Sequence, residues 1–180
     1  MKKIIVSMML VSLFSCTPNM YLKNTYGKSF RQCTIPNMFA ISSDIPHETK
    51  QIIYNGFIYW NKVLDRKMFI HVNSNNNIAV IYINIKNSTL EKSGHQYCVK
   101  NEMKFTNSSC LMGNNVTINS SCAKNHEILE TTVRHLAGNI LGLANQVKPG
   151  TLMHYQIQPG AQNPIDANEE EIEAIQMLYR

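Results

Sequence analysis

The sequence has few charged residues, few aspartates and no closely spaced cysteines. Charged residues make up 16% of the 180 residues, and the formal net charge is +5. This balance is too mild for a nucleic-acid-binding protein, and no basic stripe runs along the chain. The three aspartates are too few for calcium-binding loops, which take their ligands mainly from carboxylate oxygens. No cysteine pair has the Cys-x2-Cys spacing of a structural zinc site.

The chain begins with the features of an export signal. Lys2 and Lys3 precede an apolar stretch that is too short to span a bilayer as a mature helix. The stretch ends in Leu13-Phe14-Ser15-Cys16, which resembles the bacterial lipobox, where cleavage precedes a lipid-modified cysteine. We therefore expect a lipoprotein signal peptide at 1–15 and lipidation of Cys16, followed by a tether at 16–32. The alternative is an ordinary secretory cleavage nearby.

Two further features bear on the location of the protein. Removal of Lys2 and Lys3 with the signal lowers the net charge from +5 to +3 (5 − 2). Thr17, and not an aspartate, follows Cys16, which favours the outer membrane over the inner membrane. The sequence thus predicts an exported envelope lipoprotein that contacts the membrane through its lipid anchor.

The cysteine count agrees with export. Five cysteines leave one odd thiol, and lipidation of Cys16 accounts for it. The remaining candidates for disulfide bonds are Cys33, Cys98, Cys110 and Cys122. Four cysteines form two disulfides in three possible connectivities, and the sequence does not rank them.

Residues 33–180 are long enough for one domain with a sizeable core. We expect a strand at 38–45 and a helix after Pro46 to about Asp65, with Trp60 on its buried face. Strands follow at 67–72 and 78–85; the second has apolar residues of both parities, as in an inner strand covered on both faces. Residues 86–115 are polar and contain a short strand or hairpin, and a last short strand covers 116–119.

The next helix, entered near Asn125, carries the most informative pattern. Its apolar residues recur at helical spacing: Leu129, Val133, Leu136, Ile140 and Leu143. Gly142 supplies a residue that can turn the chain out of the helix.

The sequence His135-Leu136-Ala137-Gly138-Asn139 and its continuation resemble HExxHxxGxxH, the zinc-binding signature of the metzincin metallopeptidases. His135 stands at the first ligand position and Gly142 at the turn glycine. Leu136 stands where the general-base glutamate belongs, and Asn139 and Asn145 stand where the second and third histidines belong.

The downstream sequence extends the resemblance. Met153, in Thr151-Leu-Met-His-Tyr155, follows His135 by 18 residues (153 − 135) and resembles the methionine turn of metzincins. Tyr155 corresponds to the astacin tyrosine, which can reach the zinc. Residues 168–180 resemble the closing helix of matrixins. The resemblance covers about 126–180 and implies an α+β, metzincin-like (zincin) domain. Its parts are a twisted mixed sheet, a long N-terminal helix, an active-site helix, a methionine turn and a C-terminal helix.

The substitutions bear directly on catalysis. Zinc peptidases hold the metal with imidazoles and use a carboxylate to take a proton from the bound water. Leu136 cannot accept a proton, and amide oxygens are weak zinc ligands. We therefore expect an inactive pseudopeptidase that has no cofactor, binds a peptide or protein and does not bind nucleic acid. The alternative is a zinc metalloendopeptidase with unusual ligands, such as His135 with His154 and Tyr155.

Other histidines offer less. His126-Glu127-Ile128-Leu129-Glu130 resembles HExxH with Glu130 at the second ligand position, but glutamates at a helix start are also favoured by the helix dipole. His71 and His95 have no partners at ligand spacing.

Overall fold

The computed structural model describes residues 20–21, 35–73, 80–86, 91–92, 95–96, 98–105, 110–154 and 164–180. The expected signal peptide, most of the expected tether, Cys16, Cys33 and Tyr155 lie outside these ranges. Within them no helix is both long and apolar enough to cross a membrane.

A five-stranded mixed sheet forms the centre of the described structure. Its strand order is β2 (Phe69–His71), β1 (Asn37–Ile41), β3 (Ile81–Lys86), β7 (Leu111–Asn119) and β6 (Val99–Phe105). The first four strands are parallel, and β6 runs antiparallel to β7 at one edge. A separate two-stranded sheet pairs β4 (Glu91–Lys92) with β5 (His95–Gln96).

The inner strand β3 is covered fully on one face only. Ile81 and Ile83 are buried, whereas Tyr82 and Asn84 are half-buried. The expectation of an inner strand is confirmed, but the expected burial on both faces is wrong. The odd-numbered apolar residues Ile81 and Ile83 form the buried face of β3, and Tyr82 lies on the other face, which is only partly covered.

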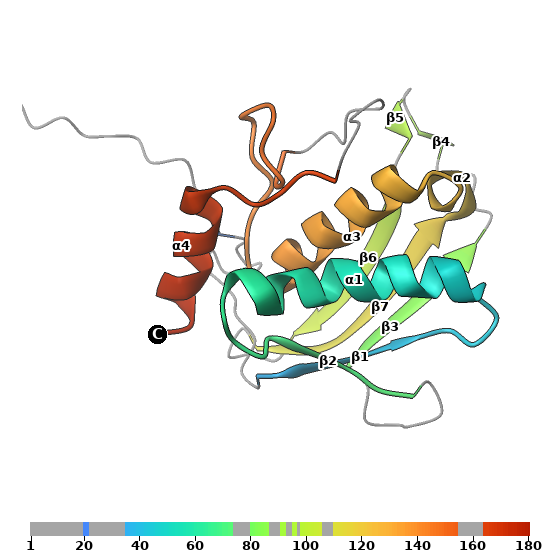
Figure 1. The fold of residues 1–180 in the computed structure, drawn as a ribbon, viewed down its shortest axis with the longest axis horizontal. Helices are drawn as coiled ribbons and strands as arrows, with labels where there is room; N and C mark the ends of the chain where they lie inside the picture. The colour runs from blue at the N-terminus through green and yellow to red at the C-terminus, as the bar shows by residue number, and fades with distance from the viewer. Residues whose placement is uncertain are drawn as a thin grey trace, which may run out of the picture.

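Two long helices, α1 (His47–Val63) and α3 (His126–Leu141), cross the same face of the sheet side by side (Figure 1). They approach closely at Gly56, where a Cβ atom would lie 2.6 Å from Val133 Cγ1. Trp60 is fully buried, as expected, and its Nε1 donates a hydrogen bond of 2.8 Å to the Arg134 carbonyl. The long N-terminal helix thus supports the helix that carries the candidate site.

The sheet differs from the expectation at its last strand. β7 has nine residues, Leu111–Asn119, where four were expected, and β6 and β7 form an antiparallel pair within the polar stretch. The sequence of β7 does not alternate between apolar and polar residues, because the polar Asn114 is buried on the same face as Val116 and Ile118. A four-residue helix, α2 (Ser120–Ala123), was also not expected.

Local capping sets both ends of α3. The Asn125 side chain accepts a hydrogen bond from the Ile128 N–H at the start. At the end, Gly142 has a φ of 108°, a left-handed conformation that favours glycine. The five apolar residues that predicted the helix are all buried. This part of the prediction is confirmed.

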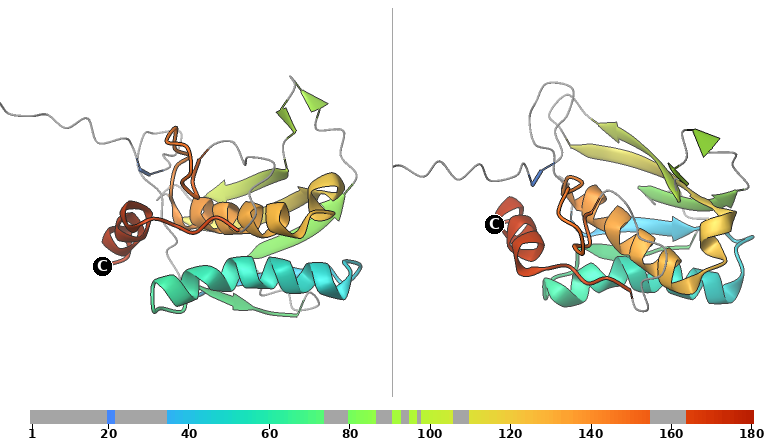
Figure 2. Two further views of the ribbon diagram at one scale, coloured as in Figure 1. Left: turned by 45° about the horizontal axis from the view of Figure 1, so that its top comes forward. Right: turned by 90° about the horizontal axis from the view of Figure 1, so that it is seen from above.

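The C-terminal helix α4 (Glu169–Leu178) begins with a capping box between Asn168 and Glu171. Ala174, Ile175 and Tyr179 are buried, and the Tyr179 hydroxyl donates a 2.9 Å hydrogen bond to the Leu141 carbonyl. Figure 2 shows α4 beside the end of α3. The residue that ends α4 therefore contacts the last turn of α3.

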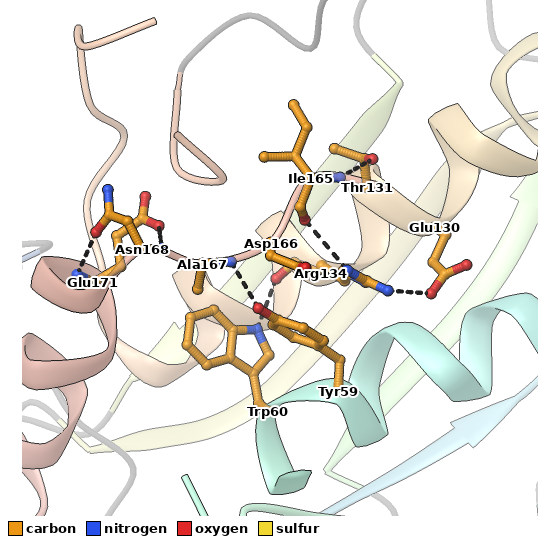
Figure 3. A network of polar contacts seen from close by, with 10 residues as sticks. All are labelled: Tyr59, Trp60, Glu130, Thr131, Arg134, Ile165, Asp166, Ala167, Asn168 and Glu171. Carbon is orange, nitrogen blue, oxygen red and sulfur yellow. Dashed lines mark hydrogen bonds and ion pairs between the residues drawn. The ribbon is translucent and has the colours of Figure 1, made fainter. Parts of the chain in front are cut away.

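A polar network holds the segment before α4 against both long helices (Figure 3). The Arg134 guanidinium pairs with Glu130 at 2.6 Å and with Asp166, and lies 4.3 Å from the Tyr59 ring centroid. The Tyr59 hydroxyl accepts a 2.7 Å hydrogen bond from the Ala167 N–H. Residues 165–167 are thereby fixed against α1 and α3 just before α4 begins.

One disulfide, Cys98–Cys122, joins the start of β6 to α2. Cys110 is also disulfide-bonded, to a partner outside the described residues. The prediction of two disulfides among Cys33, Cys98, Cys110 and Cys122 is confirmed for the pair Cys98–Cys122, whereas Cys33 lies outside the described residues.

Candidate functional site

The structure brings together the three residues at the expected ligand positions. His135 Nε2 lies 3.0 Å from Asn145 Oδ1. Asn139 Nδ2 donates hydrogen bonds to Asn145 Oδ1 at 3.1 Å and to the Leu143 carbonyl at 2.9 Å. Asn139 reaches this cluster because it lies one helical turn after His135, and Asn145 does so because Gly142 reverses the chain. We call these three residues the His–Asn cluster.

The turn at 151–154 orients the histidine ring. His135 Nδ1 lies 2.9 Å from the Leu152 carbonyl, so that a proton on Nδ1 is donated to that oxygen. Nε2 is then a lone-pair acceptor that faces Asn145. The Asn145 amide can donate to it only when its nitrogen is turned toward the ring.

Met153 lies directly below the helix that carries the cluster. It is fully buried, and a Cβ atom on Gly138 would lie 2.7 Å from its Sδ. The Gln146 N–H donates to the Met153 carbonyl at 2.6 Å, and the His154 N–H closes a turn on the Thr151 carbonyl at 3.2 Å. The residues that resemble a methionine turn therefore form a tight turn packed under α3.

The position at which the resemblance leads one to expect a general base holds a buried apolar side chain. Leu136 is 3% exposed and belongs to the hydrophobic core. Glu171 is near enough for its charge to act on the pKa of His135. Its two carboxylate oxygens, however, accept hydrogen bonds from the Met153 and Asn168 N–H groups. Both oxygens of the Glu171 carboxylate are therefore used in hydrogen bonds that hold the turn at Met153 and the start of α4.

Burial lowers the pKa of His135, against the opposing effects of the Asn145 and Leu152 hydrogen bonds. The neighbouring Glu171 also raises the pKa, while His154 lowers it further. The neutral imidazole is thus the form that the folded protein favours. A neutral ring is also the form that binds metals or accepts a hydrogen bond from a ligand.

The donor atoms fit a zinc site poorly. The His–Asn cluster offers one imidazole nitrogen and amide groups, whereas structural and catalytic zinc sites use three or four strong ligands. Asn139 presents its Nδ2 hydrogens and not a lone pair. Within the described ranges, no three His, Cys, Asp or Glu side chains gather as a possible metal site. The arrangement suits hydrogen bonding to a polar ligand better than tight metal binding.

In the other candidate motif, 126–130, His126 and Glu130 contact different partners and do not meet each other. His126 Nδ1 lies 3.8 Å from a Glu48 carboxylate oxygen at the start of α1, while Glu130 is paired with Arg134. His154 is buried next to Met153. His95 lies in β5, and Tyr155 lies outside the described residues.

A concave region lies at the start of α1 and the ends of β1 and β2. This cavity of about 350 Å³ is lined by Ile41, Ser43, His47, Lys50, Gln51, Tyr54, His71 and Asn73. Burial, and then the charge of Lys50, lower the pKa of His71. Sequence spacing gave no signal for this cavity, because His71 comes from a strand and the lysine from a helix.

Comparison with known proteins adds no relative: no protein-family model matches the chain, and no curated protein matches it significantly.

Proposed function

We propose that this chain is a metzincin-like domain of an envelope lipoprotein that has no peptidase activity and binds a peptide or protein through the His–Asn cluster. The observation that carries the proposal is the mutual hydrogen bonding of Asn139 and Asn145 beside His135, next to the buried Leu136. Side-chain amides occupy the space that ligand histidines would require, and among the described residues no three His, Cys, Asp or Glu side chains gather there as a possible metal site.

The mixed sheet, the helix ending at Gly142 and the turn at Met153 support the assignment of a metzincin-like domain. These elements place position 145 back beside position 135, as a zinc signature of this kind requires. The chemistry available there is hydrogen bonding. Asn145 is exposed, and amide side chains can both donate to and accept from the backbone of an extended peptide.

Catalysis is tested by metal content and peptide cleavage. Protein purified without chelator and then offered zinc should retain far less than one equivalent, and it should not cleave a mixed peptide library. Cleavage that is abolished by both a chelator and His135→Ala would contradict the proposal and favour the zinc peptidase with unusual ligands.

Binding is tested separately, by nuclear magnetic resonance with a library of random octapeptides. Side-chain amide signals of Asn139 and Asn145 should shift, and Asn145→Ala should reduce the shifts elsewhere around the site. Asn55→Ala is the matched control, because Asn55 is exposed on α1. Shifts of equal size in the Asn145→Ala protein would place peptide binding elsewhere.

The lipid anchor is tested by fractionation of cells. Cys16→Ser should move the protein from the membrane fraction to the soluble fraction. Unchanged membrane association would contradict lipidation of Cys16.

A further inference from the structure

Two residues of the expected tether are part of the folded domain. The Met20 carbonyl accepts a 2.8 Å hydrogen bond from the Ala144 N–H, and Tyr21 forms an antiparallel bridge with Leu143. The Tyr21 hydroxyl also donates to the Ala174 carbonyl at 3.2 Å. This short segment (blue in Figure 2) ties the N-terminal region to the end of α3 and to α4.

The position of these contacts limits the distance between the domain and a lipid on Cys16. Four residue steps separate Cys16 from Met20 (20 − 16). An extended chain covers at most about 3.6 Å per residue, so that the two Cα atoms are at most about 14 Å apart. A lipid-modified Cys16 would therefore hold the end of α3 and α4 near the bilayer surface.

The same region carries exposed apolar side chains. Val147, in the loop after α3, is 79% exposed, and Met177 on α4 is 57% exposed. The loop and α4 are linked by a loose ion pair of 3.7 Å between Lys148 and Glu170. Both apolar residues thus lie on elements that Met20 and Tyr21 contact or adjoin.

We propose that the loop 143–150 and α4 form a membrane-facing surface that rests on the phospholipid bilayer. This inference rests on the proposed lipid anchor. The exposed glutamates of α4, Glu169, Glu170 and Glu173, outnumber the exposed basic residues of this surface, Lys148 and Arg180. The surface therefore has no excess positive charge to attract anionic headgroups, and the contact is apolar and made by Val147 and Met177. A small apolar contact suffices, because a short tether gives the surface a high effective concentration at the bilayer.

The surface also bears on the His–Asn cluster. Asn145 directly follows Ala144, whose N–H holds Met20. A ligand of the cluster would therefore be bound close to the membrane, and the far ends of α1 and α3 would point away from it. The 16 residues of α3 place that far end about 24 Å from the loop, at 1.5 Å per residue.

Hydrogen exchange on the full-length protein tests this orientation. The lipidated protein in phosphatidylcholine vesicles is compared with the Cys16→Ser protein mixed with the same vesicles. Amides in 143–150 and 172–180 should exchange at least about fivefold more slowly in the lipidated protein, through reduced solvent access and opening. Amides at the start of α1, in 47–52, should exchange at equal rates.

Surface variants separate the bilayer contact from the anchor. Val147→Asp with Met177→Asp should abolish the protection of 143–150 while the protein stays in the membrane fraction. Gln51→Asp, on exposed Gln51 of α1, is the matched control and should keep the protection. Insertion of a flexible linker of about 20 residues before Met20 should weaken the protection, because effective concentration falls with tether length.

The two failures are distinguishable. Equal exchange of 143–150 in both proteins, with the lipidated protein in the membrane fraction, would overturn the membrane-facing surface and leave the anchor intact. Absence of the full chain from the membrane fraction would overturn the anchor and, with it, this inference.

Discussion

His135 Nε2 and Asn145 Oδ1 lie 3.0 Å apart, although ten residues separate them in the sequence. The left-handed Gly142 between them makes this approach possible. Both atoms are acceptors when His135 is neutral with its proton on Nδ1. A hydrogen bond therefore forms only when the Asn145 amide is rotated so that its nitrogen donates, or when Nε2 carries a proton. The contact consequently depends on the charge of His135.

The first prediction concerns the pH dependence of stability. Because burial lowers the pKa of folded His135, the unfolded chain takes up a proton there at a higher pH than the folded chain. The stability contributed by neutral His135 is complete above about pH 6.5 and is lost as the pH falls through the lower folded-state pKa. Urea unfolding between about pH 7.5 and 5 should show a smaller loss on acidification in His135→Gln than in the unchanged protein.

His71 has a pKa lowered in the same direction and contributes with the same sign. His71→Gln should therefore also flatten the profile, and the double variant should flatten it further. A profile for His135→Gln as steep as that of the unchanged protein would show that His135 does not titrate in this way.

The second prediction reverses that effect. Asn145→Asp would place a carboxylate next to His135 Nε2, and an opposite charge at this distance raises a histidine pKa. Stability from the new pair would then be present below the unfolded pKa and lost as pH rises through the raised folded pKa. The His135 ring resonance should titrate at higher pH, whereas Asn55→Asp on exposed Asn55 should leave it unchanged. An unmoved resonance in Asn145→Asp would contradict the contact.

The third prediction tests the close packing under the site. In Gly138→Ala the new Cβ would lie 2.7 Å from Met153 Sδ and 3.0 Å from Trp60 Cζ2. Overpacking costs about 1–3 kcal/mol, and the helix preference of alanine returns up to about 1 kcal/mol. Gly138→Ala should therefore lower the free energy of unfolding by roughly 1 kcal/mol.

Gly113→Ala is the matched control. Its Cβ would meet only the Val80 carbonyl at 3.9 Å, an ordinary contact distance. The free energy of unfolding should change by less than about 0.5 kcal/mol. Equal effects of the two substitutions in urea unfolding would rule out steric crowding at Gly138 as the cause.

The sequence predicted those parts of the fold that depend on periodicity and capping. The apolar residues at helical spacing from Leu129 to Leu143 predicted the position of α3. Gly142 predicted its end, because the chain turns there through a left-handed backbone conformation that favours glycine. Trp60 was placed in the core because it shares the apolar face of α1. These signals are local, so they survive without knowledge of the rest of the chain.

Other parts depend on contacts that the sequence does not display. Asn114 is buried in β7, which concealed the strand's alternation. Arg134 and Asp166 are 32 residues apart and meet only because α3 and the segment before α4 are packed together. Met20 and Tyr21 were assigned to the tether because two residues are too few to show a repeating pattern. Their contacts with Leu143 and Ala144 are tertiary and leave no local signal in the sequence.

The fourth prediction concerns the disulfide between Cys98 and Cys122. It closes a loop with a sequence separation of 24, and loops of this size contribute roughly 3 kcal/mol by restricting the unfolded chain. Cys98→Ser with Cys122→Ser should lower the free energy of unfolding by about that amount. In the unchanged protein neither cysteine should react with an alkylating reagent before reduction. Alkylation of these cysteines in the native protein would contradict the pairing.

The last prediction asks whether the site can be restored. Asn139→His with Asn145→His would add two imidazoles beside His135, on positions whose side chains already meet at 3.0 and 3.1 Å. Three imidazoles form a competent zinc site, so this double variant should bind about one zinc and gain thermal stability when zinc is added. It should remain inactive, because Leu136 cannot take the proton from a zinc-bound water.

Adding Leu136→Glu supplies the general base that the zinc signature also contains. It also places a carboxylate at a buried position of the core, which lowers the stability of the fold unless the side chain reaches the metal. We expect Leu136→Glu alone to be destabilised and inactive, and the triple variant to regain stability only with zinc. The double variant with His135→Ala is the control, and it should bind zinc much more weakly. If the double variant binds no more zinc than the control, positions 139 and 145 do not form a metal site with His135, and the assignment of these positions fails.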